Sequence, residues 1–189
     1  MINASAFVEL IDTLAADMKA GLELYSSTGH SPFALRTYIR SFFAYVEAWA
    51  YLTKQLVVQE PVLPVVSPTQ AEFALLREES YEAAENGEAV TRGGRFIPLD
   101  RNIRFAFAVT AKCFGSAYKL DTSGQGWKAF REAIRVRNRL MHPKQPADLV
   151  LSESEFQAVR EAQLWFWRVA LELQESAQAA LNSPKAPGA

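Results

Sequence analysis

The side chains of this chain that are best suited to chemistry lie in one arginine-rich stretch. Residues 135–143 read Arg-Val-Arg-Asn-Arg-Leu-Met-His-Pro, which places Arg137, Asn138 and His142 at the end of an expected helix. A guanidinium can hold a phosphate, and an imidazole can give or take a proton near neutral pH. The stretch therefore predicts a site for acid–base chemistry on a phosphate.

Projecting residues 127–142 at about 100° per residue separates Arg137 from the neighbouring arginines. The apolar side chains form a single arc that consists of Trp127, Phe130, Ala133, Ile134, Leu140 and Met141. Arg137 falls in the middle of this arc. The other side of the helix carries Arg131, Arg135 and Arg139. A guanidinium in a core must meet a carboxylate, a bound anion or a partner surface, so a structural ion pair is the alternative to a binding role.

Asn138 and His142 are four residues apart and follow the edge of the same arc. Pro143 disfavours helical geometry for the residue before it, so we expect the helix to end at His142. The carbonyl end of a helix carries partial negative charge, which favours a protonated imidazolium that can donate a proton. The alternative is that His142 only caps the helix.

The helical periodicity that must position these residues continues along almost the whole chain. Apolar side chains at three- and four-residue steps predict helices over about 4–25, 32–59, 68–84, 100–118, 126–142 and 152–181. Ser67 is the expected N-cap of the third helix, and the spacing of Ser152 and Glu155 is that of a capping box for the last. No segment alternates as a strand does. We predict an all-α fold, most simply an antiparallel bundle of five to six helices.

Composition narrows the class of protein further. The chain has 189 residues, of which 49% are hydrophobic, so it can bury a core of its own. We predict one domain over residues 1–181, with a glycine-rich loop at 86–99, and a disordered tail at 182–189. The net charge of −1 argues against a protein that binds nucleic acid through its overall charge, but it is compatible with a local basic patch.

Several classes of site and location are not expected. The single cysteine, Cys113, cannot form an internal disulfide, and it is expected to contribute to packing. The sequence contains no zinc-ligand cluster and no phosphate-binding glycine loop, so we expect no metal and no cofactor. The N-terminus lacks the charged region of a signal peptide, and no stretch is apolar enough to cross a membrane. We expect a soluble, cytoplasmic protein.

Glu47 is a candidate partner for Arg137 because it lies in a largely apolar run. However, Arg40, Glu47 and Lys54 repeat every seven residues, as charges on a solvated helix face do. We favour the interpretation that these three residues form an ordinary solvated stripe, and the ion pair with Arg137 is the alternative.

The motif and its setting resemble the HEPN superfamily. Arg137-Asn138-Arg-Leu-Met-His142 matches the arginine–polar–x3–histidine signature of that family, an aromatic-bearing helix leads into it, and a proline follows it. The resemblance is sharp over residues 127–143 and architectural elsewhere. HEPN proteins are small helical bundles that usually dimerise, and many are metal-independent ribonucleases. The resemblance therefore implies a HEPN-like bundle that cleaves RNA, as a toxin or defence effector does.

The resemblance also implies roles for individual residues. Arg137 would hold the scissile phosphate, Asn138 would position Arg137 or the RNA backbone, and His142 would transfer protons. The cations that would bind substrate are Arg135, Arg139, Lys144, Arg101 and Arg104, the last two being surface charge in the alternative interpretation. The nucleophile would be the substrate's own 2′-hydroxyl, so DNA should be inert.

The chemistry of RNA cleavage favours a homodimer. Without a metal it needs a base, an acid and positive charge on the phosphorane. The chain has two histidines, and His30 lies in a distant loop, so one motif does not easily supply both proton-transfer groups. Two juxtaposed copies would supply them. Residues 164–167, Leu-Trp-Phe-Trp, cover every direction around the last helix, which indicates an oligomer interface or, alternatively, a deep core.

The chain departs from one HEPN subclass. Toxins that a partner enzyme inactivates by nucleotide transfer carry a tyrosine two residues after the histidine, where this chain has Lys144. That mode of control is not expected, and an antitoxin or regulatory protein of another kind stays open. Two other functions also stay open: a HEPN bundle that binds RNA or protein without cutting, and a helical oligomerisation protein in which Arg137 and His142 are structural.

Overall fold

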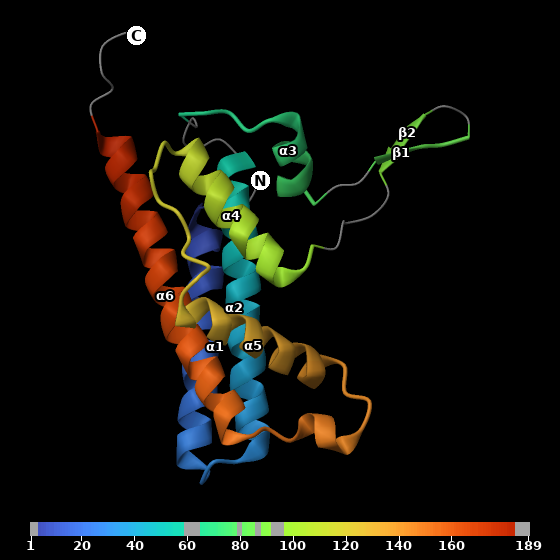
Figure 1. Cartoon of the computed structure of the whole chain (residues 1–189), viewed down its shortest axis with the longest axis vertical. Helices are drawn as coiled ribbons and strands as arrows, with labels where there is room; N and C mark the ends of the chain where they lie inside the picture. Colours follow the sequence, from blue (N-terminus) through green and yellow to red (C-terminus); the bar gives the residue numbers. More distant parts are fainter. Residues whose placement is uncertain (1–3, 59–64, 79–80, 86–87, 92–96, 184–189) are drawn as a thin grey trace. The chain divides into compact units, whose positions relative to one another are not determined.

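The computed structural model describes residues 4–58, 65–78, 81–85, 88–91 and 97–183. Within these ranges the chain forms six α-helices, one short 3-10 helix and one β-hairpin (Figure 1). The α-helices are α1 (Ala4–Ser27), α2 (Pro32–Val58), α3 (Gln70–Leu76), α4 (Leu99–Cys113), α5 (Gln125–Met141) and α6 (Glu153–Asn182). The short elements are β1 (Tyr81–Ala83), β2 (Ala89–Thr91) and η1 (Pro146–Leu149). The predicted all-α fold is confirmed, and no helix in these ranges is long and apolar enough to cross a membrane.

The chain divides into two compact units that are interleaved along the sequence. The first consists of Met1–Trp49 and Asp121–Ala170, and the second of Ala50–Leu120 and Leu171–Ala189. Helices α2 and α6 each contribute residues to both units. The single domain over residues 1–181 stays a prediction. Of the predicted tail, Asn182 ends α6, and residues 184–189 lie outside the described residues.

The segment between α2 and α4 departs most from the sequence prediction. Helix α3 begins after Thr69 rather than Ser67, because Thr69 and Glu72 form a reciprocal capping box. It ends at Leu76 and does not continue to residue 84. The chain instead forms β1, which pairs antiparallel with β2 from the predicted glycine-rich loop. The prediction of no strand is therefore wrong here, and residues 86–87 and 92–96 of that loop lie outside the described residues.

Helix α4 is also shorter than the predicted 100–118, because glycine ends it early. Gly115 has a φ of +70°, a left-handed conformation that glycine adopts without steric cost. The amide of Gly115 donates to the carbonyl of Lys112 at 3.1 Å, and that of Ser116 to the carbonyl of Ala111 at 2.8 Å. These two bonds form the Schellman arrangement that satisfies the last carbonyls of a helix.

Aromatic side chains form the core of the first unit and hold α5 in place. Phe130 of α5 is fully buried and stacks on Phe166 of α6, with ring centroids 5.9 Å apart and an interplanar angle of 14°. The Phe43 ring of α2 lies 6.2 Å from Phe130, and the Trp165 ring of α6 lies 5.1 Å from it. Because one ring of α5 contacts both neighbouring helices, the core fixes the position of the helix that carries the motif.

The same core contains a buried polar chain. The Tyr38 hydroxyl donates to Oε1 of Gln163, and Nε2 of Gln163 donates to Sδ of Met18 at 3.4 Å. Tyr38 is completely buried and Gln163 is 4% exposed. Burial raises the pKa of Tyr38 to about 12, whereas the charge of Arg160 lowers it less. The folded protein therefore favours the protonated phenol.

Replacing Tyr38 with phenylalanine is expected to lower the free energy of unfolding by about 1–3 kcal/mol, because Oε1 of Gln163 loses its donor in the core. The folded pKa of about 12 exceeds the unfolded value near 10, so the contribution of Tyr38 is present below pH 10. It is lost as the pH rises from about 10 towards 12. Urea unfolding of both proteins along this pH range measures the difference. A difference that stays constant above pH 10 would contradict the assignment to the phenol.

The second unit has an apolar core around α4. Its buried residues are Val57, Leu76, Val109, Cys113, Phe114 and Ala177. Cys113 is free and completely buried, which confirms its expected packing role. Lys54 is also completely buried, and its ammonium group pairs with Glu78 and donates to Oδ1 of Asn102 at 3.0 Å. This lysine is therefore compensated inside the unit, as a buried charge requires.

Candidate functional site

The motif occupies the last turn of α5, in the first unit. The helix ends at Met141, and His142 is its C-cap, with φ −130° and ψ 55°. The backbone amide of His142 still donates to the carbonyl of Asn138 at 3.1 Å. Because Pro143 disfavours helical geometry at the preceding residue, the chain leaves the helix there. The predicted end of this helix is confirmed.

The buried face of α5 is rotated relative to the predicted arc. Val136, which the arc omitted, is 1% exposed, whereas Met141 is 45% exposed. Ile134 is only partly buried. Arg137 therefore lies at the boundary between the core and the solvent rather than in the middle of the apolar face, and 23% of its side chain is exposed. A guanidinium at such a boundary is accessible to an anion from solution.

Glu47 of α2 is the acidic partner of Arg137. Nη2 of Arg137 donates to Oε1 of Glu47, and Nη1 donates to Oδ1 of Asn138 at 3.0 Å. The Glu47 side chain is 44% exposed. Glu47 is exposed, as expected for a solvated stripe, but it also has a specific partner, because the alternative, an ion pair with Arg137, is what the structure has.

The other two members of that stripe also make specific contacts. Arg40 of α2 is exposed, but its Nη2 donates to the carbonyl of Leu140 at 3.1 Å. That carbonyl is one of the last four of α5, which have no partner inside their own helix. A cation there also offsets the negative end of the helix dipole. Lys54 is the buried lysine of the second unit, so the stripe prediction fails for it.

His142 is solvent-exposed, one helical turn beyond Asn138. The second histidine, His30, lies between α1 and α2, where its ring centroid is 4.9 Å from that of Tyr25. His30 has a φ of +66°, so its backbone is in the left-handed region. Both histidines are therefore exposed, but only His142 belongs to the motif, whereas His30 contacts Tyr25 between α1 and α2.

The predicted substrate-binding cations belong to both units, three to the first and two to the second. Arg135 pairs with Glu132, and Arg139 pairs with Glu155 at 2.9 Å while donating to the carbonyl of Val150 at 3.1 Å. Lys144 is exposed, and its backbone amide donates to Oδ2 of Asp148 at 2.8 Å. The remaining two, Arg101 and Arg104, are on α4 in the second unit.

Two arginines that the sequence analysis did not assign to the site contact the chain at the end of α5 and in η1, which follows it. Arg40 reaches Leu140, as described above, and Nη1 of Arg36 donates to the carbonyl of Leu149 at 3.4 Å. Both come from the first turns of α2, four residues apart, and so share one helix face. That spacing was visible in the sequence, but nothing local indicated that the face meets the end of α5.

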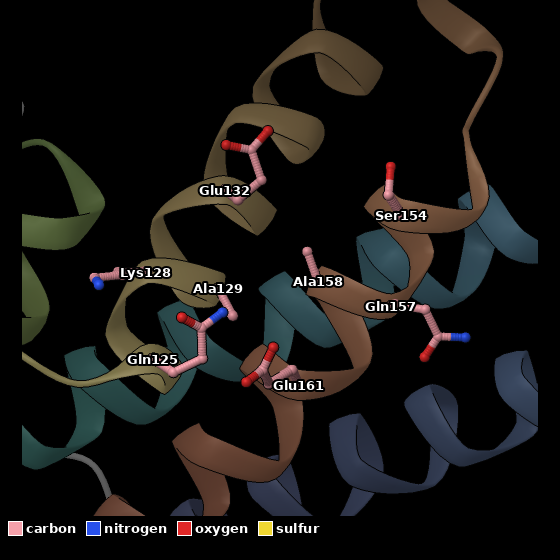
Figure 2. A pocket seen from close by; sticks show the side chains of 8 residues that line it. All are labelled: Gln125, Lys128, Ala129, Glu132, Ser154, Gln157, Ala158 and Glu161. Atoms are coloured by element: carbon pink, nitrogen blue, oxygen red, sulfur yellow. The ribbon is translucent and has the colours of Figure 1, made fainter.

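A groove runs between α5 and α6, but the motif does not line it (Figure 2). Its volume is about 420 Å³, and each helix contributes four residues at positions i, i+3, i+4 and i+7. The lining residues are Gln125, Lys128, Ala129, Glu132, Ser154, Gln157, Ala158 and Glu161. Arg137, Asn138 and His142 are not among them, so the candidate site lies outside this groove.

The chemistry available at this surface is that of a cation and a proton-transfer group. Arg137 can hold an anion, and His142 can exchange a proton with a bound group. Among the described residues, no group of three or more His, Cys, Asp or Glu side chains is placed to hold a metal ion. The side chains of Arg137 and His142 can themselves provide charge stabilisation and acid–base chemistry.

The fold and the site define an all-α protein with an exposed arginine–asparagine–x3–histidine motif at the end of a helix. Comparison with protein-family models, with curated proteins and with solved structures finds no match. Membership of the HEPN superfamily stays a prediction that rests on the motif and its helical setting.

Proposed function

We propose that this protein is a metal-independent endoribonuclease of HEPN type. The observation that supports this function best is the arrangement of Arg137, Asn138 and His142 on an exposed surface. Asn138 holds one side of the Arg137 guanidinium, while His142 presents its imidazole to solvent one turn further on. In this proposal Arg137 binds the phosphate and His142 is the group that transfers a proton to or from it.

The proposed reaction uses the substrate's own 2′-hydroxyl. This oxygen loses its proton to a base and attacks the adjacent phosphorus, and the P–O bond to the next nucleotide's 5′-oxygen breaks. An acid protonates the departing 5′-oxygen. The products are a 2′,3′-cyclic phosphate and a free 5′-hydroxyl. Arg137 would stabilise the charge on the phosphorane, and His142 would serve as base or acid.

A second copy of the chain would complete the site. One copy has a single exposed motif histidine, whereas the reaction needs both a base and an acid. A homodimer that brings two motifs together provides two His142 side chains and two Arg137 guanidinium groups. In this proposal the protein acts on RNA in the cytoplasm, as a toxin or defence effector held in check by a protein partner.

The test is cleavage of a mixed RNA pool in EDTA, with DNA of matched sequence as control. The wild-type protein is expected to cut RNA without metal, to leave cyclic phosphate ends and to spare DNA, because DNA lacks the nucleophile. The oligomeric state is measured in the same buffer. A folded, dimeric protein that cuts no RNA would rule out the nuclease function.

A second candidate is a helical oligomerisation protein in which Arg137 and His142 are structural. The ion pair between Arg137 and Glu47 favours it, because arginine on the edge of a core often serves only to pair with a carboxylate. A folded oligomer that neither cuts RNA in the assay above nor binds it in a separate binding measurement would identify this function.

A further inference from the structure

The ion pair at the site places a carboxylate where the proposed function needs a phosphate. A guanidinium binds carboxylate and phosphate oxygens with the same planar set of N–H donors. Glu47 already accepts from Nη2 of Arg137, so part of this donor set is occupied in the free protein. A phosphate that approaches Arg137 must therefore share the guanidinium with Glu47 or displace it.

We propose that Glu47 is an internal competitor for the phosphate-binding guanidinium of Arg137, and that RNA binds by displacing its carboxylate. This inference rests on the proposed function, because it takes Arg137 as the residue that holds the scissile phosphate. It goes beyond that function by assigning Glu47 a role in setting the affinity of the site for RNA.

Of the two side chains in the ion pair, Glu47 is the one that a phosphate can displace. Among the described residues the hydrogen bond and ion pair of its carboxylate are with Arg137, and 44% of its side chain is exposed. Arg137 has a second anchor, because its Nη1 donates to Asn138 at 3.0 Å, and only 23% of its side chain is exposed. When the carboxylate moves into solvent, Asn138 still orients the guanidinium. The cation is therefore held in place and the competing anion is mobile.

Solvent exposure also limits how strongly Glu47 competes. Water screens an ion pair at the surface, so breaking it costs little compared with breaking a buried one. Removing the competing charge should then strengthen RNA binding by about two- to fivefold at low ionic strength. The effect should shrink as salt is added, because salt screens exposed charges.

The salt dependence of binding provides an independent measure. With Glu47 charged, Arg137 and Glu47 together contribute almost no net charge to a bound phosphate. With glutamine at position 47 the phosphate meets one uncompensated cation, so one more counterion is released on binding. The plot of log K against log salt concentration should then become steeper by up to about 0.7, the value per phosphate for a single strand.

The experiment measures binding of a short 2′-O-methyl RNA, which has no free 2′-hydroxyl and is not cut. Fluorescence anisotropy at several salt concentrations compares wild type, Glu47→Gln, Arg137→Ala and the double variant. Glu161→Gln is the matched control, because Glu161 is exposed, belongs to the same unit and lines the separate groove on α6. Thermal unfolding shows that each variant is folded, and Arg137→Gln replaces Arg137→Ala if alanine is not tolerated.

The expected result is tighter binding and a steeper salt dependence in Glu47→Gln only, with both effects absent when Arg137 is also replaced. An equal gain in Glu161→Gln would reveal a general charge effect and overturn the proposal. Unchanged or weaker binding in Glu47→Gln, with weaker binding in Arg137→Ala, would overturn it and leave the proposed ribonuclease intact. If Arg137→Ala binds as wild type does, the role of Arg137 fails too, and cleavage in EDTA tests the nuclease function separately.

Discussion

Replacing His142 with alanine is expected to lower the rate of RNA cleavage by about 10²- to 10⁴-fold, the usual contribution of a general acid or base. The free energy of unfolding should change by less than about 0.5 kcal/mol, because the side chain is exposed and only its backbone amide caps α5. Arg137→Ala should lower the rate by about 10²- to 10³-fold, since it removes charge stabilisation of the phosphorane.

The chain offers matched controls for both substitutions. His30→Asn removes the other histidine, and asparagine tolerates the positive φ at that position. Arg131→Ala removes an exposed arginine from α5 without touching the motif. Single-turnover cleavage and urea unfolding are measured on all four variants. A His142→Ala protein that cuts RNA at the wild-type rate would show that the site has been placed on the wrong residues.

The sequence predicted the motif helix well because its signals are local. Apolar residues at helical spacing identified α5, and Pro143 located its end at His142. The rotation of α5 about its own axis could not be predicted from the local sequence. It depends on which side of α5 meets Phe43, Trp165 and Phe166, and that contact turns Val136 inward and Met141 outward. A helical projection gives the order of residues around the axis but does not show where the neighbouring helices lie.

The partners of charged residues could not be predicted for a similar reason. Glu47 and Arg137 are 90 residues apart, and Lys54 of α2 pairs with Glu78, which lies in the turn after α3. The seven-residue spacing of Arg40, Glu47 and Lys54 looks the same whether a helix face is solvated or covered. Arg40 and Glu47 are exposed and Lys54 is buried. Only the tertiary structure shows this difference and the specific partner that each of the three has.

The hairpin shows the limit of periodicity for short elements. Strands β1 and β2 pair three residues each, with Tyr81 opposite Thr91 and Ala83 opposite Ala89. Three residues give too few positions to distinguish alternation from helical spacing. The sequence around residue 82 also contains helix formers, Glu82, Ala83 and Ala84, which favoured the extension of α3. Local pairing between strands outweighed this weak preference.

Gly126→Ala is expected to lower the free energy of unfolding by about 1–3 kcal/mol, even though alanine is the better helix former. Gly126 lies in the first turn of α5, where that helix crosses Trp165 of α6. A Cβ at this position would overlap the Cδ1 and Cγ atoms of the indole and lie 2.8 Å from Trp165 Cβ. The indole has little freedom to move, because it is 5% exposed and packs on Trp127 and Phe130.

Two comparisons test whether the lower free energy of unfolding of Gly126→Ala arises from the contact with Trp165. Gln125→Ala changes the adjacent exposed position of the same helix and should stay within about 0.5 kcal/mol of wild type. Trp165→Leu shortens the side chain that the new methyl group would meet, so Gly126→Ala should cost clearly less in that background. Equal costs in both backgrounds, measured by urea unfolding, would mean that Gly126 is not needed for the close approach of α5 and α6. Because the same crossing orients the helix that ends in Arg137 and His142, Gly126→Ala should also slow cleavage, whereas Gln125→Ala should not.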